Sequence, residues 1–263
     1  MTAPAATPIA SSPPRLPVRT RAAILVRMLA IQGSWNYETM LGNGMGFCIE
    51  PALRHLPGGA GGPAYRDALA RESRYFNAHP YMASVAVGAL ARAELDGAPP
   101  QTIDRFRTAL CGPLGSVGDR LVWAGWLPLC SLVALASFGL GGGPLEVTGL
   151  FLVLYNAGHL ALRAWGLSVG WQHGLRVAAA LANPVLRRGP EHIVRAASLI
   201  AGVALPLALM RVIGPGRTLI GGVMVSILAA AVLLARLHGR AEGWRIALGL
   251  LTAFVIFSVI RHG

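Results

Sequence analysis

The sequence predicts an all-α integral membrane protein in which N-terminal interfacial or re-entrant helices precede about four or five transmembrane helices. Composition supports this fold class, because 54% of the 263 residues are hydrophobic and only 13% are charged. The mean hydropathy is +0.55, well above that of most soluble domains. The second half also contains apolar runs long enough to cross about 30 Å of hydrocarbon as helices.

The N-terminal part is expected to lie at the membrane surface. Residues 1–20 are rich in Pro, Ala, Ser and Thr, which predicts a disordered cytoplasmic arm. A single membrane domain is then expected over residues 21–263. Residues 21–32 are apolar around Arg27 but too short to span, so we expect an interfacial amphipathic helix there. Residues 34–53 begin with polar groups and are broken by glycines, which favours a re-entrant or half-membrane element.

Three further short helices complete the amphipathic and re-entrant part, residues 21–118. A charged, water-facing helix is predicted over 65–77 and a second helix over 81–95. An amphipathic helix over 101–110 then leads into a glycine-rich segment. We expect all three at the membrane surface.

Transmembrane helices are predicted over residues 119–263. A basic link, residues 171–195, separates the second span from the third and resembles a cytoplasmic loop. The predicted spans are residues 121–140, 145–165, 193–213, 218–235 and 244–260.

Charge and cysteine usage exclude several classes of protein. The formal net charge is +12, but a nucleic-acid binder needs a solvated basic face, for which these apolar runs leave little room. All 23 basic residues are arginines, and those beside the apolar runs are better interpreted as a topology signal. Cys48, Cys111 and Cys130 are too far apart to suggest a metal or redox site, and no cofactor is predicted.

Polar and aromatic motifs beside the apolar runs identify a family. Residues 32–38 (QGSWNYE), 76–81 (FNAHPY) and 112–119 (GPLGSVGD) resemble the IID subunit of mannose/fructose/sorbose-type phosphotransferase system (PTS) sugar permeases. So do Tyr155-Asn156 with residues 160–166 (LALRAWG), and residues 170–174 (GWQHG). These blocks follow the family's order and spacing over roughly residues 20–213.

The resemblance implies a role in sugar transport. In this family IID pairs with a IIC membrane subunit to conduct a hexose, commonly as a trimer of IIC–IID heterodimers in contact with membrane lipid. Soluble IIA and IIB phosphocarriers relay the phosphoryl group, and IID carries no phosphorylated residue, so we expect a non-catalytic subunit. The resemblance also implies a multi-pass protein of the bacterial cytoplasmic (inner) membrane, and we expect a cytoplasmic N-terminus.

The first motif supplies the chemistry of sugar recognition. An indole stacks on the apolar face of a sugar ring, while amides, hydroxyls and carboxylates bind its hydroxyl groups. If residues 34–38 are helical, Ser34 and Glu38 share one face. The alternative is that the aromatic residues belong to an interfacial belt and that Ser34 caps a helix. The candidate substrate-binding residues are Gln32, Ser34, Trp35, Asn36 and Glu38.

The second and third motifs carry candidate structural or gating residues. Asn77 and His79 precede Pro80, a position that suits helix capping, and the alternative is gating or packing against IIC. The third motif is either a structural hinge or a turn near the substrate, and its aspartate can cap the span that follows. Its candidate residues are Gly112, Pro113, Gly115, Gly118 and Asp119.

Three polar residues lie inside the second predicted span. Asn156, His159 and Arg163 are spaced three and four apart, so they share one stripe of a helix. Polar groups at membrane depth face protein or a wet cavity. We therefore expect this stripe to pack against neighbouring spans or IIC.

Departures from the family pattern leave a second function open. Arg120 stands where the family usually has proline, and His159 stands where it usually has a basic residue. Residues 214–217 replace an insertion that family members often carry. These differences favour, as the alternative, an accessory or regulatory membrane subunit that moves no sugar. A membrane enzyme is disfavoured, because the sequence shows no nucleophile elbow, metal-ligand set or paired catalytic carboxylates.

Overall fold

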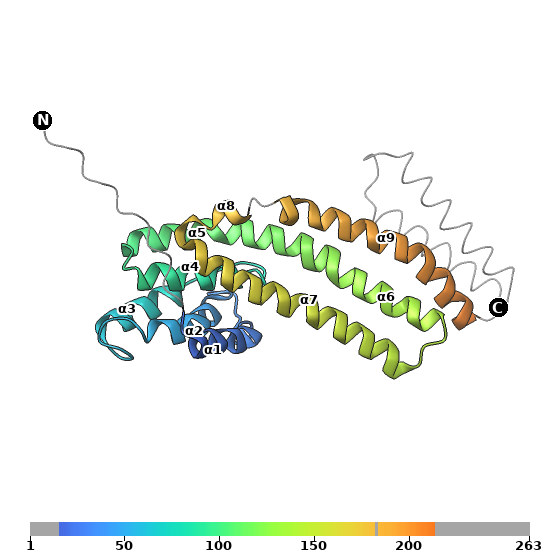
Figure 1. The fold of residues 1–263 in the computed structure, drawn as a ribbon, viewed down its shortest axis with the longest axis horizontal. Coiled ribbons are helices and arrows are strands. Elements are labelled where there is room, and N and C mark those ends of the chain that lie inside the picture. The colour runs from blue at the N-terminus through green and yellow to red at the C-terminus, as the bar shows by residue number, and fades with distance from the viewer. Residues whose placement is uncertain (1–15, 182–183, 214–263) are drawn as a thin grey trace, which may run out of the picture.

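The computed structural model describes residues 16–181 and 184–213, and this part contains helices and no strand. Figure 1 shows a cluster of short helices at one end and long helices that extend away from it side by side. The predicted spans at 218–235 and 244–260, and most of the predicted arm, lie outside the described residues. The elements are α1 (Val18–Arg27), η1 (Met28–Ala30), α2 (Gly42–Leu53), α3 (Pro63–Glu72), α4 (Ala83–Leu95), α5 (Pro100–Gly118), η2 (Asp119–Trp126), α6 (Leu127–Gly139), α7 (Pro144–His173), η3 (Gly174–Arg176), α8 (Ala178–Leu181) and α9 (Pro184–Ile213).

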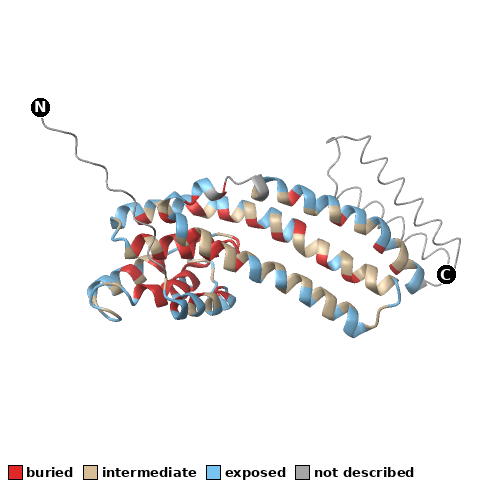
Figure 2. Cartoon of the chain, viewed as in Figure 1, coloured by how far each residue is buried: buried red, intermediate tan, exposed pale blue. Residues whose placement is uncertain are grey.

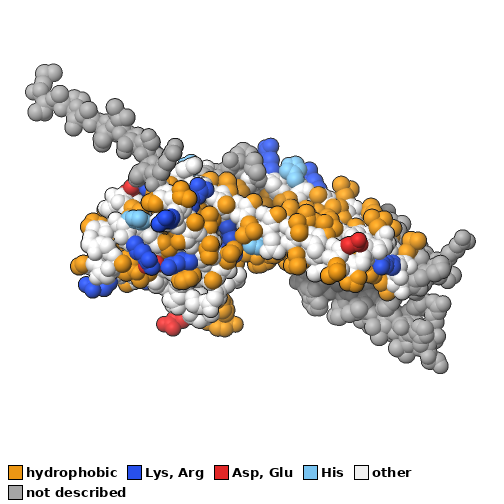
Figure 3. Space-filling view, turned by 60° about the horizontal axis from the view of Figure 1, so that its bottom comes forward, with side chains coloured by type: hydrophobic (Ala, Val, Ile, Leu, Met, Phe, Trp, Pro, Cys, Tyr) orange, Lys and Arg blue, Asp and Glu red, His pale blue; other side chains and the backbone are white. Residues whose placement is uncertain are grey.

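The long helices confirm the first three predicted spans. α5, η2 and α6 join into one helix, α7 continues into η3, and α9 forms the third. Each is long and apolar enough to cross a membrane. Hydrophobic side chains cover much of this part of the surface, and charged ones are sparse there (Figure 3). The three candidate spans are Pro100–Gly139, Pro144–Arg176 and Leu186–Val212.

Two segments that the sequence predicts to be irregular are helical. The expected loop over residues 171–195 consists largely of the end of α7, the short helices η3 and α8, and the start of α9. The expected hinge or turn over residues 112–119 lies within the continuous helix of α5 and η2. A helix that continues toward the membrane satisfies its own backbone groups, whereas a turn there would leave several unpaired.

The fourth helix, α4, lies at the centre of the short-helix cluster and is buried inside the protein. Eleven of the thirteen residues of α4 are buried, and Figure 2 shows this core at the junction with the long helices. Glycines allow α4 and α7 to touch backbone to backbone. A side chain added at Gly88 would meet Trp171 N at 2.8 Å, and one at Gly170 would meet Ala89 N at 2.8 Å. Close contact along α7 explains why an alanine-rich helix is buried here.

The glycine-broken segment after the first motif also forms a regular helix. In α2 the glycines are contact points and do not interrupt the helix. A Cβ at Gly42 would lie 2.7 Å from Ser73 O, and one at Gly44 would collide with Ile31 O. The irregular backbone predicted for residues 34–53 is therefore confined to the residues before α2. The depth of this segment in the bilayer stays a prediction.

The predicted amphipathic helix is present and begins earlier than expected. α1 starts at Val18, inside the predicted arm, and η1 extends it to Ala30. Ile24, Met28 and Ile31 are fully buried, whereas Val26 is 66% exposed. One side of this helix therefore packs on the cluster while the other presents apolar groups outward, as an interfacial helix requires.

Candidate functional site

Residues 34–38 form a turn, and they are not helical. Asn36 builds it: its Oδ1 accepts hydrogen bonds from the backbone N–H of Glu38 (3.0 Å) and of Thr39 (2.8 Å). Its Nδ2 donates to Ser34 O at 3.1 Å and to Thr39 Oγ1 at 2.9 Å. The condition under which Ser34 and Glu38 would share a helical face is therefore not met. Asn36 has a structural role, because its amide already uses both ends within the loop.

The other motif residues of this loop face outward. Gln32, Ser34 and Glu38 are exposed, Trp35 is 45% exposed, and Tyr37 is 84% exposed. The rings of Trp35 and Tyr37 meet edge to face, with centroids 4.9 Å apart. Two large aromatic rings held outward on a rigid turn are available to a ligand or to another chain.

Backbone hydrogen bonds join the first motif to the second. Leu41 N–H donates to Phe76 O at 2.9 Å, and Phe76 N–H donates to Thr39 O at 3.1 Å. Between them Met40 adopts a positive φ of 53°, a conformation that non-glycine residues rarely take. The chain thus brings together residues 32–41 and 76–81, which the sequence could identify only as separate blocks.

A buried ion pair, Arg107 with Glu72, packs against the first residue of the second motif. Arg107 Nε donates to Glu72 Oε2 at 2.9 Å, and its Nη2 donates to Glu72 O and Arg74 O. The guanidinium also lies 5.6 Å from the ring centroid of Phe76. Burial raises the pKa of Glu72, while the neighbouring Arg107 opposes the shift. Sequence reasoning missed this pair, because neither residue differs in pattern from the exposed charges of α3 and α5.

The second and third motifs meet at His79 and Gly118. A Cβ at Gly118 would lie 2.9 Å from His79 Nδ1 and closer still to its Cβ. His79 Nδ1 accepts the backbone N–H of Tyr81 at 3.2 Å, in the turn before α4. The N-cap of α4 is Met82, with no side-chain cap, so the expected capping of this helix by Asn77 or His79 is not observed. Burial, with the nearby charge of an arginine on α7, lowers the pKa of His79 to about 4. Asn77 is exposed and Pro80 is buried.

The remaining residues of the third motif lie along α5 and η2. Gly112 has open space around it among the described residues, and a Cβ at Gly115 would lie 4.0 Å from Ala78 Cα. Pro113 is accommodated inside the helix. Asp119 is exposed in the middle of a continuous helix, so the prediction that it caps the following span is wrong.

The polar stripe of α7 turns inward at Arg163, whereas Asn156 and His159 are half-buried. Arg163 is 4% exposed and donates from Nη1 to Met28 O, at the end of α1. His159 Nε2 and Asn156 Oδ1 are 2.9 Å apart, and Asn156 Nδ2 donates to Leu152 O at 2.6 Å. The stripe therefore ties a candidate span to the short-helix cluster.

Tyr81 lies at the centre of these polar groups. Its hydroxyl is 2.7 Å from that of Tyr155, and its ring stacks on His159 with centroids 4.9 Å apart. Arg163 lies 4.6 Å from its centroid, and the ring of Trp123 is 5.8 Å away. Sequence reasoning gave no role to Trp123, which forms part of an otherwise apolar run, and quoted Tyr155 only within a family block.

Three nitrogen atoms of this cluster have no partner within the described part of the chain: His79 Nε2, His159 Nδ1 and Arg163 Nε. Buried nitrogen atoms of this kind hydrogen-bond to ordered water or to a polar ligand. The described residues contain no group of three or more His, Cys, Asp or Glu side chains placed to hold a metal ion. The chemistry that the cluster offers is therefore hydrogen bonding and aromatic contact.

Solved structures with the same fold are membrane proteins. One, described only as a membrane protein, has a TM-score of 0.70 at 22% identity, over 94% of this chain and 98% of the other. A complex of the mannose transporter ManYZ with microcin E492 has a TM-score of 0.55 at 22% identity, over 94% and 97%. These matches establish the fold.

Sequence comparisons identify the family. The mannose-specific EIID component of Escherichia coli is 30% identical over 176 residues, which are 64% of this chain and 60% of the relative. The fructose permease IID component of Bacillus subtilis is 30% identical over 64% of this chain and 62% of its own length. The sorbose-specific EIID component of Klebsiella pneumoniae is 31% identical over 61% and 59%. The matched part thus spans about three fifths of each relative. The model of the PTS system mannose/fructose/sorbose family IID component matches residues 15–234, and this helical membrane protein therefore belongs to that family.

Proposed function

We propose that this chain forms, with a IIC membrane subunit, the translocation path for a hexose-type sugar that is phosphorylated through soluble IIA and IIB subunits. The observation that carries the proposal is the exposed aromatic loop. Trp35 and Tyr37 are held outward on a turn that Asn36 fixes, beside the exposed polar residues Gln32 and Glu38. An aromatic face beside an amide and a carboxylate suits a sugar ring with several hydroxyl groups.

The proposed sugar pocket is shared between two chains. The loop is exposed, so the chain leaves one side of any pocket there open. A IIC subunit that covers the loop would complete it. Family membership and relatives named for mannose, fructose and sorbose support a hexose as the substrate. We also propose the family's arrangement, a trimer of IIC–IID heterodimers in the bacterial inner membrane with a cytoplasmic N-terminus.

We propose that the contacts around Tyr81 fix the position of the loop relative to the spans. Arg163 binds the end of α1, four residues before the loop begins, and Gly118 packs on His79 behind the second motif. In this proposal the second and third motifs position the loop and do not contact the sugar.

Transport tests the proposal directly. The chain is produced with its IIC, IIA and IIB partners in cells that lack other mannose-type permeases, and uptake of radiolabelled mannose, fructose and sorbose is measured. We expect intracellular sugar phosphate to accumulate for at least one hexose, and only when this chain is present. If an intact complex assembles and none of these sugars is taken up, the chain is an accessory subunit and the proposal is wrong.

A further inference from the structure

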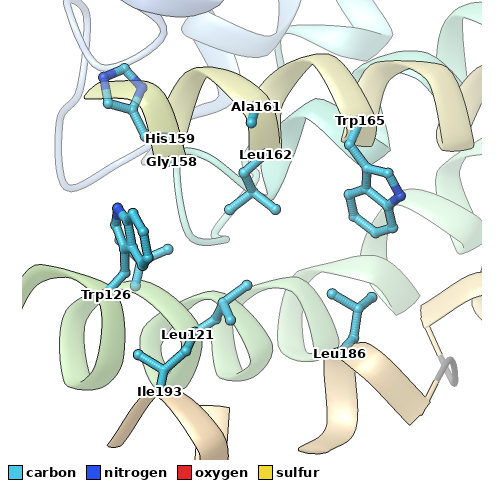
Figure 4. A pocket seen from close by; sticks show the side chains of 10 residues that line it. Leu121, Trp126, Gly158, His159, Ala161, Leu162, Trp165, Leu186 and Ile193 are labelled. Carbon is cyan, nitrogen blue, oxygen red and sulfur yellow. The ribbon is translucent and has the colours of Figure 1, made fainter. Parts of the chain in front are cut away.

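A cavity of about 460 Å³ lies between α7, α9 and the η2 segment. Figure 4 shows Leu162 and Trp165 pointing from α7 across this space toward Leu121 and Leu186. The volume lies within the range of pockets that hold small organic ligands. Its lining is mostly apolar, so its occupant must present hydrocarbon.

The cavity lies near one end of the three predicted apolar runs, residues 121–140, 145–165 and 193–213. Leu121 begins the apolar run of the first span, Trp165 ends that of the second, and Ile193 begins that of the third. α6 and α9 lead away from this region and α7 returns to it (Figure 1). Trp126 and Trp165 both line the cavity, and tryptophan is enriched where hydrocarbon meets the headgroups. The cavity is therefore at the depth of lipid headgroups and the first carbons of their acyl chains.

Basic residues surround this end of the spans. Arg120 directly precedes the lining residue Leu121, and Arg187 directly follows the lining residue Leu186; both arginines are exposed. In the described part of the chain neither has a carboxylate within 4.0 Å, whereas Arg195 reaches Glu191 at that distance. The other exposed charged residues nearby are Asp119, Arg188 and His192. The balance is positive, which favours an anionic headgroup.

We propose that this cavity binds an acyl chain of an anionic phospholipid whose phosphate lies against Arg120 and Arg187. An apolar cavity within the membrane favours a hydrocarbon chain, and the guanidinium groups of the two arginines bind phosphate. The indole of Trp126 lines the same cavity, and its buried N–H has no hydrogen-bond partner among the described residues. None of the residues that line the cavity belongs to the loop of residues 32–38, so this site is distinct from the proposed sugar pocket.

Native mass spectrometry of the full-length chain, alone and with its IIC partner, tests the lipid site. Phosphatidylglycerol or phosphatidylcholine is added to the protein in detergent, and retained lipid is counted after activation in the gas phase. We expect phosphatidylglycerol to be retained at least about tenfold better than phosphatidylcholine. Arg120→Gln with Arg187→Gln abolishes this preference. Arg66→Gln with Arg105→Gln, two exposed arginines of α3 and α5 away from the cavity, keeps it.

A second pair of variants separates the cavity from the surface charge. Leu162→Phe places a larger side chain in the cavity and is expected to reduce the retained phosphatidylglycerol. Leu152→Phe makes the same change on the same helix at a site that is 49% exposed and outside the lining, and it keeps the lipid. Three results would each overturn the proposal: equal retention of the two lipids, retention by Leu162→Phe equal to wild type, or loss of the lipid when IIC is bound. The last result would assign the cavity to the partner subunit.

Discussion

Replacing Gly170 by alanine should loosen the contact between the short-helix cluster and the long helices. The new methyl carbon would lie 2.8 Å from Ala89 N and nearer still to Val85 O, although ordinary contacts begin at 3.4 Å. Both of these atoms belong to the backbone of α4, so no flexible side chain can move aside. The two helices must separate along this closely packed contact.

The expected cost follows from overpacking. Inserting one methyl group into a tightly packed contact costs about 1–3 kcal/mol, and here the only relief is movement of a whole helix. For a chain of this size that corresponds to a fall in melting temperature of roughly 3–10 °C. Thermal unfolding of the purified full-length chain in detergent, followed by intrinsic tryptophan fluorescence, measures the shift.

Gly149→Ala is the matched control. It makes the same change on α7, where no described atom lies within 4 Å of the added carbon. Since alanine favours a helix over glycine by about 0.8–1.0 kcal/mol, this variant should melt at or above the wild-type temperature. If Gly170→Ala melts within a degree of Gly149→Ala, the backbone contact between α4 and α7 does not exist as described.

Three other changes probe the loop, the buried ion pair and the buried histidine. Arg107→Met leaves Glu72 buried and unpaired, so it should lower the unfolding free energy by about 3–5 kcal/mol, and the additional change Glu72→Gln should recover part of that loss. Asn36→Ala removes the hydrogen bonds of the turn, so sugar uptake should fall although the complex still assembles on size-exclusion chromatography. His79 should lower the stability in acid, because its pKa in the folded state, about 4, is below the ordinary value of 6.5. The unfolded chain then binds the proton more readily, and up to about 3 kcal/mol is lost as the pH falls from 6.5 to 4.

Controls for these three changes differ. The double variant at positions 72 and 107 must be more stable than Arg107→Met alone, or the ion pair does not explain the loss. Uptake by Asn36→Ala equal to wild type would show that the turn tolerates other conformations. For the pH effect, the difference in stability between wild type and His79→Gln is compared at each pH, since the raised pKa of Glu72 contributes with the opposite sign in both proteins. A difference that does not vary with pH between 4 and 6.5 would contradict the buried neutral histidine.

Apolar run length predicted the three spans that lie within the described residues, because a run of about twenty mostly apolar residues has few other stable structures. Glycine was harder to interpret. The same residue permits a turn or a close helix contact, and a single sequence does not separate the two uses. Residues 112–119 were therefore expected to bend, yet Gly118 serves to admit His79, and Gly42 serves to admit the backbone near Ser73.

Within the candidate site the sequence identified the motifs but not their grouping. The stripe of Asn156, His159 and Arg163 followed from helical periodicity, and Arg163 at one end of it is buried as expected. The pairing of Arg107 with Glu72 depends on how α3 crosses α5, and no local pattern encodes that crossing. The turn at Asn36 was not predicted. Its hydrogen bonds require a non-helical backbone, whereas the shared face of Ser34 and Glu38 was considered only for a helix.

Sugar uptake by a Trp35→Ala variant is the most direct test of the proposal that the exposed loop faces a pocket shared with IIC. The variant and wild type are each produced with their IIC, IIA and IIB partners, and the KM for the transported hexose is measured together with the amount of assembled complex. Tyr75→Ala, at an aromatic residue that is 53% exposed outside the loop, is the control. We expect Trp35→Ala to raise the KM at least about tenfold with assembly unchanged, as the loss of ring stacking requires. A KM equal to those of wild type and the control would contradict a role for the loop in binding sugar.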